Sequence, residues 1–187
     1  MKALTLWQPW SWAIAHAGKR VENRTWAPPA SVIGQRVAIH AGLKLDHDAM
    51  ERLARDPKVL AKRVFRMRGR DHVTALSVYN PQSRFFGEPI PLVFGIVESV
   101  ATIAGYVDDD GEATWRKRDG SLVTGVSSDH LRCHDARLSK WFMGPLGWVL
   151  DDVVALPEPV PCKGAQGLWT LPGDVESAVL AQLGGVR

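Results

Sequence analysis

The first 42 residues alternate between the apolar spacing of strands and that of a helix. Residues 3–7 (ALTLW) and 35–42 (QRVAIHAG) are short apolar runs typical of strands. Between them, apolar residues recur at the i, i+3, i+4 and i+7 positions of a helix: Trp10, Ala13, Ile14 and Ala17. This spacing predicts a short helix that begins at Pro9 and ends before Gly18, with the four apolar side chains toward the core.

A period of two replaces the helical spacing directly after this helix. In VENRTW (21–26), every second residue belongs to the same face. One of the two faces is charged and aromatic, and it consists of Glu22, Arg24 and Trp26. The alternation predicts a strand that displays these three side chains together.

Residues 43–88 are predicted to form an inserted helical arm. Asp46 stands where an N-cap belongs, before a helix expected over 47–55. Asp56-Pro57 is then typical of the start of a second helix, which we expect to run to about Met67.

Basic charge is concentrated in this arm. The chain has 23 Lys and Arg against 20 Asp and Glu, and a net charge of +3 alone says little about partners. Between Arg52 and Arg70, however, eight basic residues are opposed only by Asp56. Four of them are called the basic patch below: Arg55, Lys58, Lys62 and Arg66. The patch has two interpretations, a solvated helix face or a surface that tracks the phosphates of a nucleic acid.

The second half of the chain predicts mainly strands. Residues 91–107 contain the strongest strand pattern, and two further strands are predicted over 147–161 and 167–172. Asp119-Gly120 is typical of a hairpin turn. Asp174 is placed to cap a short closing helix.

These elements predict an α+β fold, in which a small, mostly antiparallel β-barrel is flanked by short helices. The length suits one domain over 1–187, with 43–88 as its insertion. Hydrophobic residues make up 45% and charged residues 23%, so the composition favours a folded chain. Because the sequence lacks both an apolar run of roughly 18–20 residues and the pattern of a secretion signal, we expect a cytoplasmic protein without membrane association.

Metal-binding residues do not form a recognisable motif. The candidates for a zinc site are His130, Cys133, His134 and Cys162. They lack a CxxC pair, and adjacent residues such as Cys133 and His134 rarely both reach one ion. We therefore expect two reduced cysteines, no metal and no other cofactor.

Candidate chemistry lies in HAGKRVENRTW (16–26), which sets three charged residues close together at a helix end: Lys19, Glu22 and Arg24. One interpretation is structural, because a cation at Lys19 suits the carboxyl end of a helix dipole and the other two can pair on a strand face. The other interpretation is a pocket lined by the three charges. Spacing alone leaves both open.

The residues around this stretch resemble the opening of the ASCH domain, a member of the PUA-like superfamily. That family carries the signature G-x-K-x-x-E-x-R, after a strand and a helix that often begins Gln-Pro-Trp. Here Gln8-Pro9-Trp10 stands upstream, and the signature is matched by Lys19, Glu22 and Arg24.

The match has one departure and a limited extent. Ala17 replaces the first glycine of the signature, and Gly18 follows one place later, which shifts the bend without removing a charge. The strand VFGIVESVATI and the closing segment PVPCKGAQGLWTLP are also similar to the family. The resemblance therefore covers about 1–42 and 91–172.

The resemblance implies a cleft beside the barrel that receives RNA or a single, often modified, nucleobase. Arg24 is expected to grip a phosphate or a base edge, and Glu22 to accept a hydrogen bond from an exocyclic amine. Trp7, Trp10 or Trp26 can supply a stacking surface. The expected binding residues are Gln8, Trp10, Lys19, Glu22, Arg24 and Trp26. The expected partner is single-stranded RNA or a modified nucleoside.

The same resemblance implies a second class of function. A small bacterial group similar to this domain deacetylates N4-acetylcytidine, with the signature lysine and a threonine at the place of Glu22, and other relatives are suspected ribonucleases. Since Glu22 replaces the threonine, a hydrolase would use Lys19 and Glu22 as an acid/base pair. The sequence leaves open whether the chain is an enzyme or a binding domain.

Overall fold

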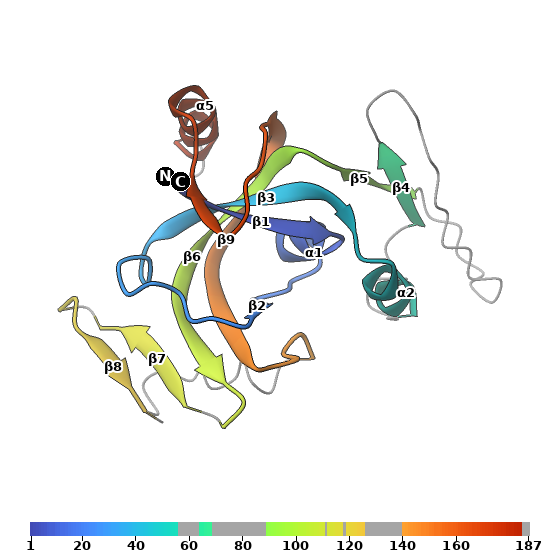
Figure 1. Ribbon diagram of the computed structural model, residues 1–187. Helices are drawn as coiled ribbons and strands as arrows, with labels where there is room; N and C mark the ends of the chain where they lie inside the picture. The colour runs from blue at the N-terminus through green and yellow to red at the C-terminus, as the bar shows by residue number, and fades with distance from the viewer. Residues whose placement is uncertain (56–63, 69–88, 111, 118, 126–139, 185–187) are drawn as a thin grey trace.

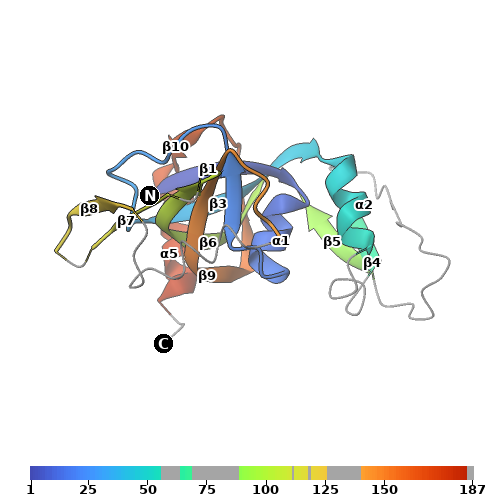
Figure 2. The same ribbon diagram turned by 90° about the horizontal axis from the view of Figure 1, so that it is seen from below.

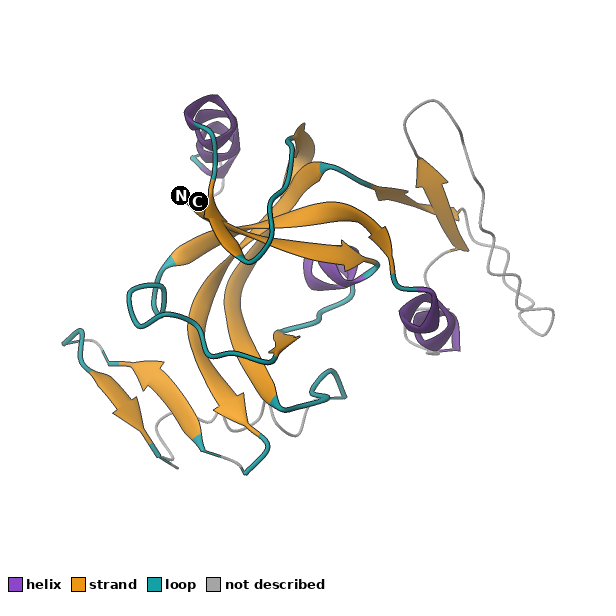
Figure 3. Cartoon of the chain, viewed as in Figure 1, coloured by secondary structure: helices purple, strands orange, loops and turns teal. Residues whose placement is uncertain are grey.

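The computed structural model describes residues 1–55, 64–68, 89–110, 112–117, 119–125 and 140–184, without the side chains of 54–55, 64–68 and 89–91. A large sheet curls into a half-barrel, and short helices lie around it (Figures 1 and 3). This architecture confirms the predicted α+β class. In the described part of the chain, no helix combines the length and the apolar character needed to cross a membrane.

Eight strands build the half-barrel. Its path runs β10-β1-β3-β6-β7-β8, and β9 joins by pairing with both β6 and β2. The pairs are antiparallel except β1 with β3, which run parallel. The strands are β1 (Lys2–Gln8), β2 (Val21–Arg24), β3 (Arg36–Leu45), β6 (Ile96–Asp108), β7 (Ala113–Arg116), β8 (Leu122–Thr124), β9 (Leu146–Pro161) and β10 (Leu168–Thr170).

Three helices and a small second sheet complete the described elements. The helices are α1 (Trp10–His16), α2 (His47–Arg55) and α5 (Gly173–Leu183), and the second sheet pairs β4 (Val64–Arg68) with β5 (Pro89–Val93). Figure 2 shows α2, β4 and β5 on one side of the half-barrel and the β7–β8 hairpin on the other. The core between the strands and α1 includes Ile14, Trp115 and Trp148, each at most 2% exposed.

Several local predictions are confirmed. Asp46 caps α2, because the amide of Ala49 donates to its Oδ1 at 2.9 Å. Gly120, at φ +86°, lies in the turn between the paired strands β7 and β8. Gly18 follows the end of α1 at φ +72°, a left-handed conformation that favours glycine.

Four element boundaries differ from the predictions. The helix expected to reach Met67 is wrong over its last residues, because 64–68 form β4 in parallel pairing with β5; residues 56–63 lie outside the described part. The strand expected over 91–107 is two strands, β5 and β6, separated by a turn at Gly95 with φ +67°.

The remaining two differences concern helix starts. Pro9 is the N-cap of α1 and not its first helical residue. Pro172 precedes α5, and Asp174 lies inside its first turn without forming a side-chain cap. In that position its negative charge still interacts favourably with the positive end of the helix dipole.

Candidate functional site: a charged pocket beside two tryptophans

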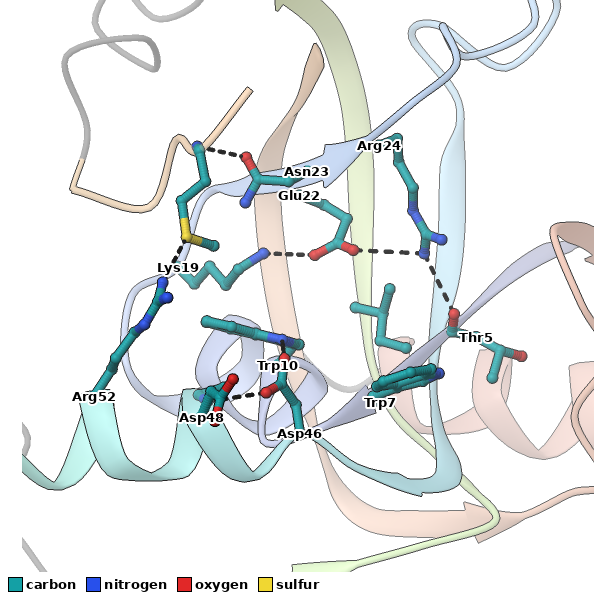
Figure 4. A pocket seen from close by; sticks show the side chains of 13 residues that line it. Thr5, Trp7, Trp10, Lys19, Glu22, Asn23, Arg24, Asp46, Asp48 and Arg52 are labelled. Atoms are coloured by element: carbon teal, nitrogen blue, oxygen red, sulfur yellow. Dashed lines mark hydrogen bonds and ion pairs between the residues drawn. The ribbon is translucent and has the colours of Figure 1, made fainter. Parts of the chain in front are cut away.

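The end of α1 and the strand β2 bring the three signature charges into one row. The turn at Gly18 reverses the chain, and the amide of Lys19 donates to the carbonyl of Ala13 at 3.0 Å. Strand β2 then pairs with β9, which places Glu22 opposite Trp148. Figure 4 shows the resulting order along the pocket, from Lys19 through Glu22 to Arg24.

Lys19 and Glu22 form a short, buried ion pair. Lys19 is 1% exposed, and its Nζ lies 2.5 Å from Glu22 Oε2 and 2.5 Å from the carbonyl oxygen of Val21. Burial lowers the pKa of Lys19 below its ordinary value, and the Glu22 carboxylate opposes that shift. The pair therefore holds the carboxylate in one orientation and keeps the ammonium away from solvent.

Arg24 is the most accessible of the three charges. Its Nη2 lies 3.5 Å from Glu22 Oε1 and donates to the carbonyl of Thr5 at 3.3 Å, while its side chain is 21% exposed. Its Nε is buried and has no hydrogen-bond partner among the described residues. Because part of its side chain is exposed, Arg24 keeps guanidinium donors that a ligand can reach.

Trp10 forms the base of the pocket below this row. Its Nε1 donates to Asp46 Oδ2 at 2.9 Å, and Lys19 Nζ lies 5.4 Å from its ring centroid. Trp141 packs edge-on against the same ring, with centroids 6.4 Å apart. These three contacts fix the Trp10 ring, and they anchor the start of α2 beside it.

Helix α2 supplies the facing wall. Asp48 and Arg52 lie one turn apart on α2 and both line the pocket. Arg52 Nη1 donates to Met143 Sδ at 3.2 Å, which connects the helix to the segment before β9. Asn23 holds that segment, because its side chain exchanges two hydrogen bonds of 2.8 Å with the backbone of Trp141 and Met143.

The pocket enclosed by these elements has a volume of about 380 Å³. This volume lies at the lower end of the range for small-molecule sites, roughly 300–1,000 Å³. Its lining residues are Thr5, Leu6, Trp7, Trp10, Lys19, Glu22, Asn23, Arg24, Asp46, Asp48, Ala49, Arg52 and Met143.

The structure brings four of the six predicted binding residues into this pocket: Trp10, Lys19, Glu22 and Arg24. Gln8 does not join them, because it is fully buried and its side chain bonds to the carbonyl of Val93, the carboxylate of Glu98 and the amide of Trp12. The prediction for Gln8 is therefore corrected to a structural role.

Trp26 also lies outside the pocket. Its ring packs edge-on against Trp148 with centroids 4.7 Å apart, and its carbonyl accepts a hydrogen bond from Trp148 Nε1. Strand β2 ends at Arg24, so the alternation that should have carried Trp26 to the charged face stops two residues earlier. The prediction that Trp26 lines the cleft is therefore wrong.

The structural interpretation is met in one respect, because Glu22 and Arg24 pair at 3.5 Å, but the described hydrogen bonds of the Lys19 side chain go to Val21 and Glu22 and not to the end of α1. The orphan carbonyl of Ile14 instead accepts from Arg20 Nη1 at 2.9 Å. Arg20 thus satisfies the helix end, and Lys19 is left to pair with Glu22.

Sequence reasoning missed Asn23, Asp48, Arg52 and Met143 as pocket residues. The spacing of Asp48 and Arg52 on one predicted helix was a usable signal for a shared face, although it did not indicate what that face meets. Nothing in the sequence near Met143 indicated its place.

Other predictions lie outside the described residues. In the basic patch, Lys58 and Lys62 are not described, and Arg55 and Arg66 are described only as backbone within α2 and β4. Of the four zinc candidates, His130, Cys133 and His134 are likewise not described. No group of three or more possible metal ligands occurs among the residues that are described.

The fold and the charged pocket define a PUA-like barrel with a site beside its first helix. The family model of the ASCH domain matches residues 4–108, more than half of the chain. The chain therefore belongs to the ASCH domain family, as the signature predicted. The match ends at the close of β6, so the similarity of the later segments stays a prediction. No curated protein matches the chain.

Proposed function

We propose that this chain is an RNA-binding domain whose pocket receives a nucleobase, presented by a single strand or as a modified nucleoside. The observation that carries the proposal is the row from Lys19 to Arg24, which faces the rings of Trp7 and Trp10 across the pocket (Figure 4). Membership of the ASCH family supports RNA as the general class of partner.

The chemistry of the row suits a base edge. Glu22 is held by Lys19 at 2.5 Å, so its carboxylate is oriented before a ligand arrives. A fixed carboxylate accepts a hydrogen bond from an exocyclic amine, and the planar fork of Arg24 donates to a ring carbonyl or nitrogen. Preorganised groups of this kind reduce the ordering cost of binding.

The test is binding of a fluorescently labelled single-stranded RNA, about 12 nucleotides long, measured by polarisation at low and at moderate salt. We expect Arg24→Ala to weaken binding about tenfold, the effect typical of losing one charge-assisted contact. Arg36→Ala is the matched control, since Arg36 is exposed on β3 and does not line the pocket. Equal binding by all three proteins would refute the proposed site.

A second candidate function is hydrolysis, and the geometry of Lys19 and Glu22 is the observation that favours it. In the deacetylation of N4-acetylcytidine, Glu22 would take a proton from water while the water oxygen bonds to the acetyl carbon. The bond from that carbon to N4 would then break, and Lys19 would give its proton to the departing amine, releasing acetate and cytidine.

Burial of Lys19 favours the binding function over the hydrolase. At 1% exposure its ammonium contacts Glu22 and Val21, and a leaving group reaches it only after the pair opens. The two functions predict different results in an assay of acetate release from N4-acetylcytidine. If the protein is a hydrolase, Lys19→Ala abolishes this release while RNA binding largely survives. For a binding domain, wild-type protein releases no acetate.

A further inference from the structure

The charges that line the pocket balance one another. Its ionisable residues are three cations, Lys19, Arg24 and Arg52, and three carboxylates, Glu22, Asp46 and Asp48. A phosphate placed inside would meet as many negative as positive groups, so the pocket provides no net electrostatic attraction for it. A group without net charge, carrying both donors and acceptors, matches this lining better.

The two pocket tryptophans differ in how freely their rings can meet a ligand. Trp10 is fixed by Asp46, Lys19 and Trp141, as described above. Trp7 is 50% exposed and lines the pocket from β1. Trp7 is therefore the ring on which a ligand can stack with the least rearrangement.

Lys44 supports the ring of Trp7. Its Nζ lies 5.0 Å from the ring centroid, a distance at which a cation is attracted to an aromatic face. Lys44 does not line the pocket, so it holds the indole without occupying the space of a ligand. The parallel pairing of β1 with β3 brings these two residues together.

From the balanced charge and the open ring, we infer that the pocket takes an uncharged, planar heterocycle stacked on Trp7, and that phosphates stay outside it. This inference rests on the proposed function and deepens it, since it assigns the stacking surface to Trp7 and leaves the phosphates outside the pocket. Glu22 and Arg24 then meet the edge of the ring, which must carry both a hydrogen-bond donor and an acceptor. Such a ring comes from an RNA strand or from a free nucleoside.

The experiment compares two labelled strands of equal length and charge, a mixed-sequence RNA of about 12 nucleotides and an abasic strand with the same number of phosphates. We expect Trp7→Ala to weaken RNA binding about tenfold, because stacking on one aromatic ring has roughly that value. Binding of the abasic strand stays unchanged in the variant. Trp7→Phe keeps most of the RNA affinity, which shows that an aromatic ring is what matters.

Leu43→Ala is the matched control, because Leu43 is 82% exposed on β3 and does not line the pocket. The inference is overturned if Trp7→Ala leaves RNA binding unchanged, or if it weakens both strands equally. If Arg24→Ala weakens RNA binding and Trp7→Ala does not, the proposed function stands and only this inference fails. If neither Arg24→Ala nor Trp7→Ala changes RNA binding, both fail.

A competition experiment distinguishes a ring presented by an RNA strand from the ring of a free nucleoside. A mixture of adenosine, cytidine, guanosine and uridine displaces the labelled RNA if a free nucleoside suffices, whereas ribose 5-phosphate at the same concentration does not. If only unlabelled RNA competes, the ring must be presented by a strand. Displacement by ribose 5-phosphate as effective as that by the nucleosides would overturn the inference, since the pocket would then hold the phosphate.

Discussion

Replacing Glu22 with glutamine removes the carboxylate from a lysine that is almost completely buried. Lys19 Nζ then keeps its hydrogen bond to the carbonyl of Val21 and its contact with the Trp10 ring, while glutamine offers a neutral oxygen in place of the carboxylate. The ammonium must either stay charged without an anionic partner or lose its proton when the protein folds. Both alternatives destabilise the folded state.

Loss of the Lys19 proton on folding sets an upper limit on the free energy that the substitution costs. Lysine has an ordinary pKa of 10.5, and one pKa unit corresponds to about 1.36 kcal/mol. Folding with neutral Lys19 therefore costs at most about 5 kcal/mol at pH 7 and about 2 kcal/mol at pH 9. We expect Glu22→Gln to lower the free energy of unfolding by roughly 3–5 kcal/mol at pH 7.

The sign of the pH dependence follows from the direction of the shift. In the wild-type protein the Glu22 carboxylate raises the pKa of Lys19 and so opposes the effect of burial. Without this carboxylate, the pKa of Lys19 is lower in the variant than in the wild-type protein. Between these two pKa values, the unfolded variant holds a proton that its folded state lacks, so the stability of the variant rises with pH. The difference in stability between the two proteins should narrow from pH 7 to pH 9.

Urea denaturation, followed by tryptophan fluorescence at both pH values, measures this difference. The control is the double variant Lys19→Met with Glu22→Gln, which removes both charges and should be more stable than Glu22→Gln alone. A stability difference that stays constant from pH 7 to pH 9 would show that Lys19 keeps its proton in the folded variant, which would refute the expected loss of that proton on folding.

Three further predictions concern the core and the basic patch. Burial lowers the pKa of His40 below its ordinary value of 6.5. The neutral histidine therefore stabilises the fold above about pH 6.5, and this stabilisation is lost as the pH falls toward the lowered pKa. Between pH 7.5 and 5, the melting temperature of His40→Gln should fall less than that of the wild-type protein. Gly105→Ala should cost about 3 kcal/mol or more in urea denaturation, because the new Cβ would lie 2.2 Å from the carbonyl oxygen of Thr114, whereas Gly173→Ala, with open space around it, should be neutral. Replacing all four residues of the basic patch with glutamine should reduce the salt dependence of RNA binding, and an unchanged slope would make the patch a solvated surface.

The short-range features of this protein could be predicted because they depend on backbone periodicity and on conformational preferences of single residues. The left-handed glycine after α1, the cap at Asp46 and the start of a strand at Val21 each follow from a few neighbouring positions. The family signature places three charges within six residues, so their proximity also follows from local spacing. These features do not depend on the rest of the fold.

The sequence did not separate the tryptophans into core and pocket. Trp7, Trp10 and Trp26 had similar sequence signals, yet one is half exposed, one is fixed at the base of the pocket and one packs against Trp148. Exposure depends on which distant elements cover a ring, and local spacing carries no information about them. Gln8 illustrates the same limit, since its partners lie on β5 and β6.

The sequence by itself determined the family, the strand-rich class and the row of Lys19, Glu22 and Arg24. Only the tertiary structure decided that α2 closes the opposite side with Asp48 and Arg52, and that Asn23 brings Met143 to the same pocket. The physical reason is that the row is built by residues adjacent in the chain, whereas the pocket is built by contacts between segments more than 20 positions apart, whose approach is set by the packing of the whole half-barrel.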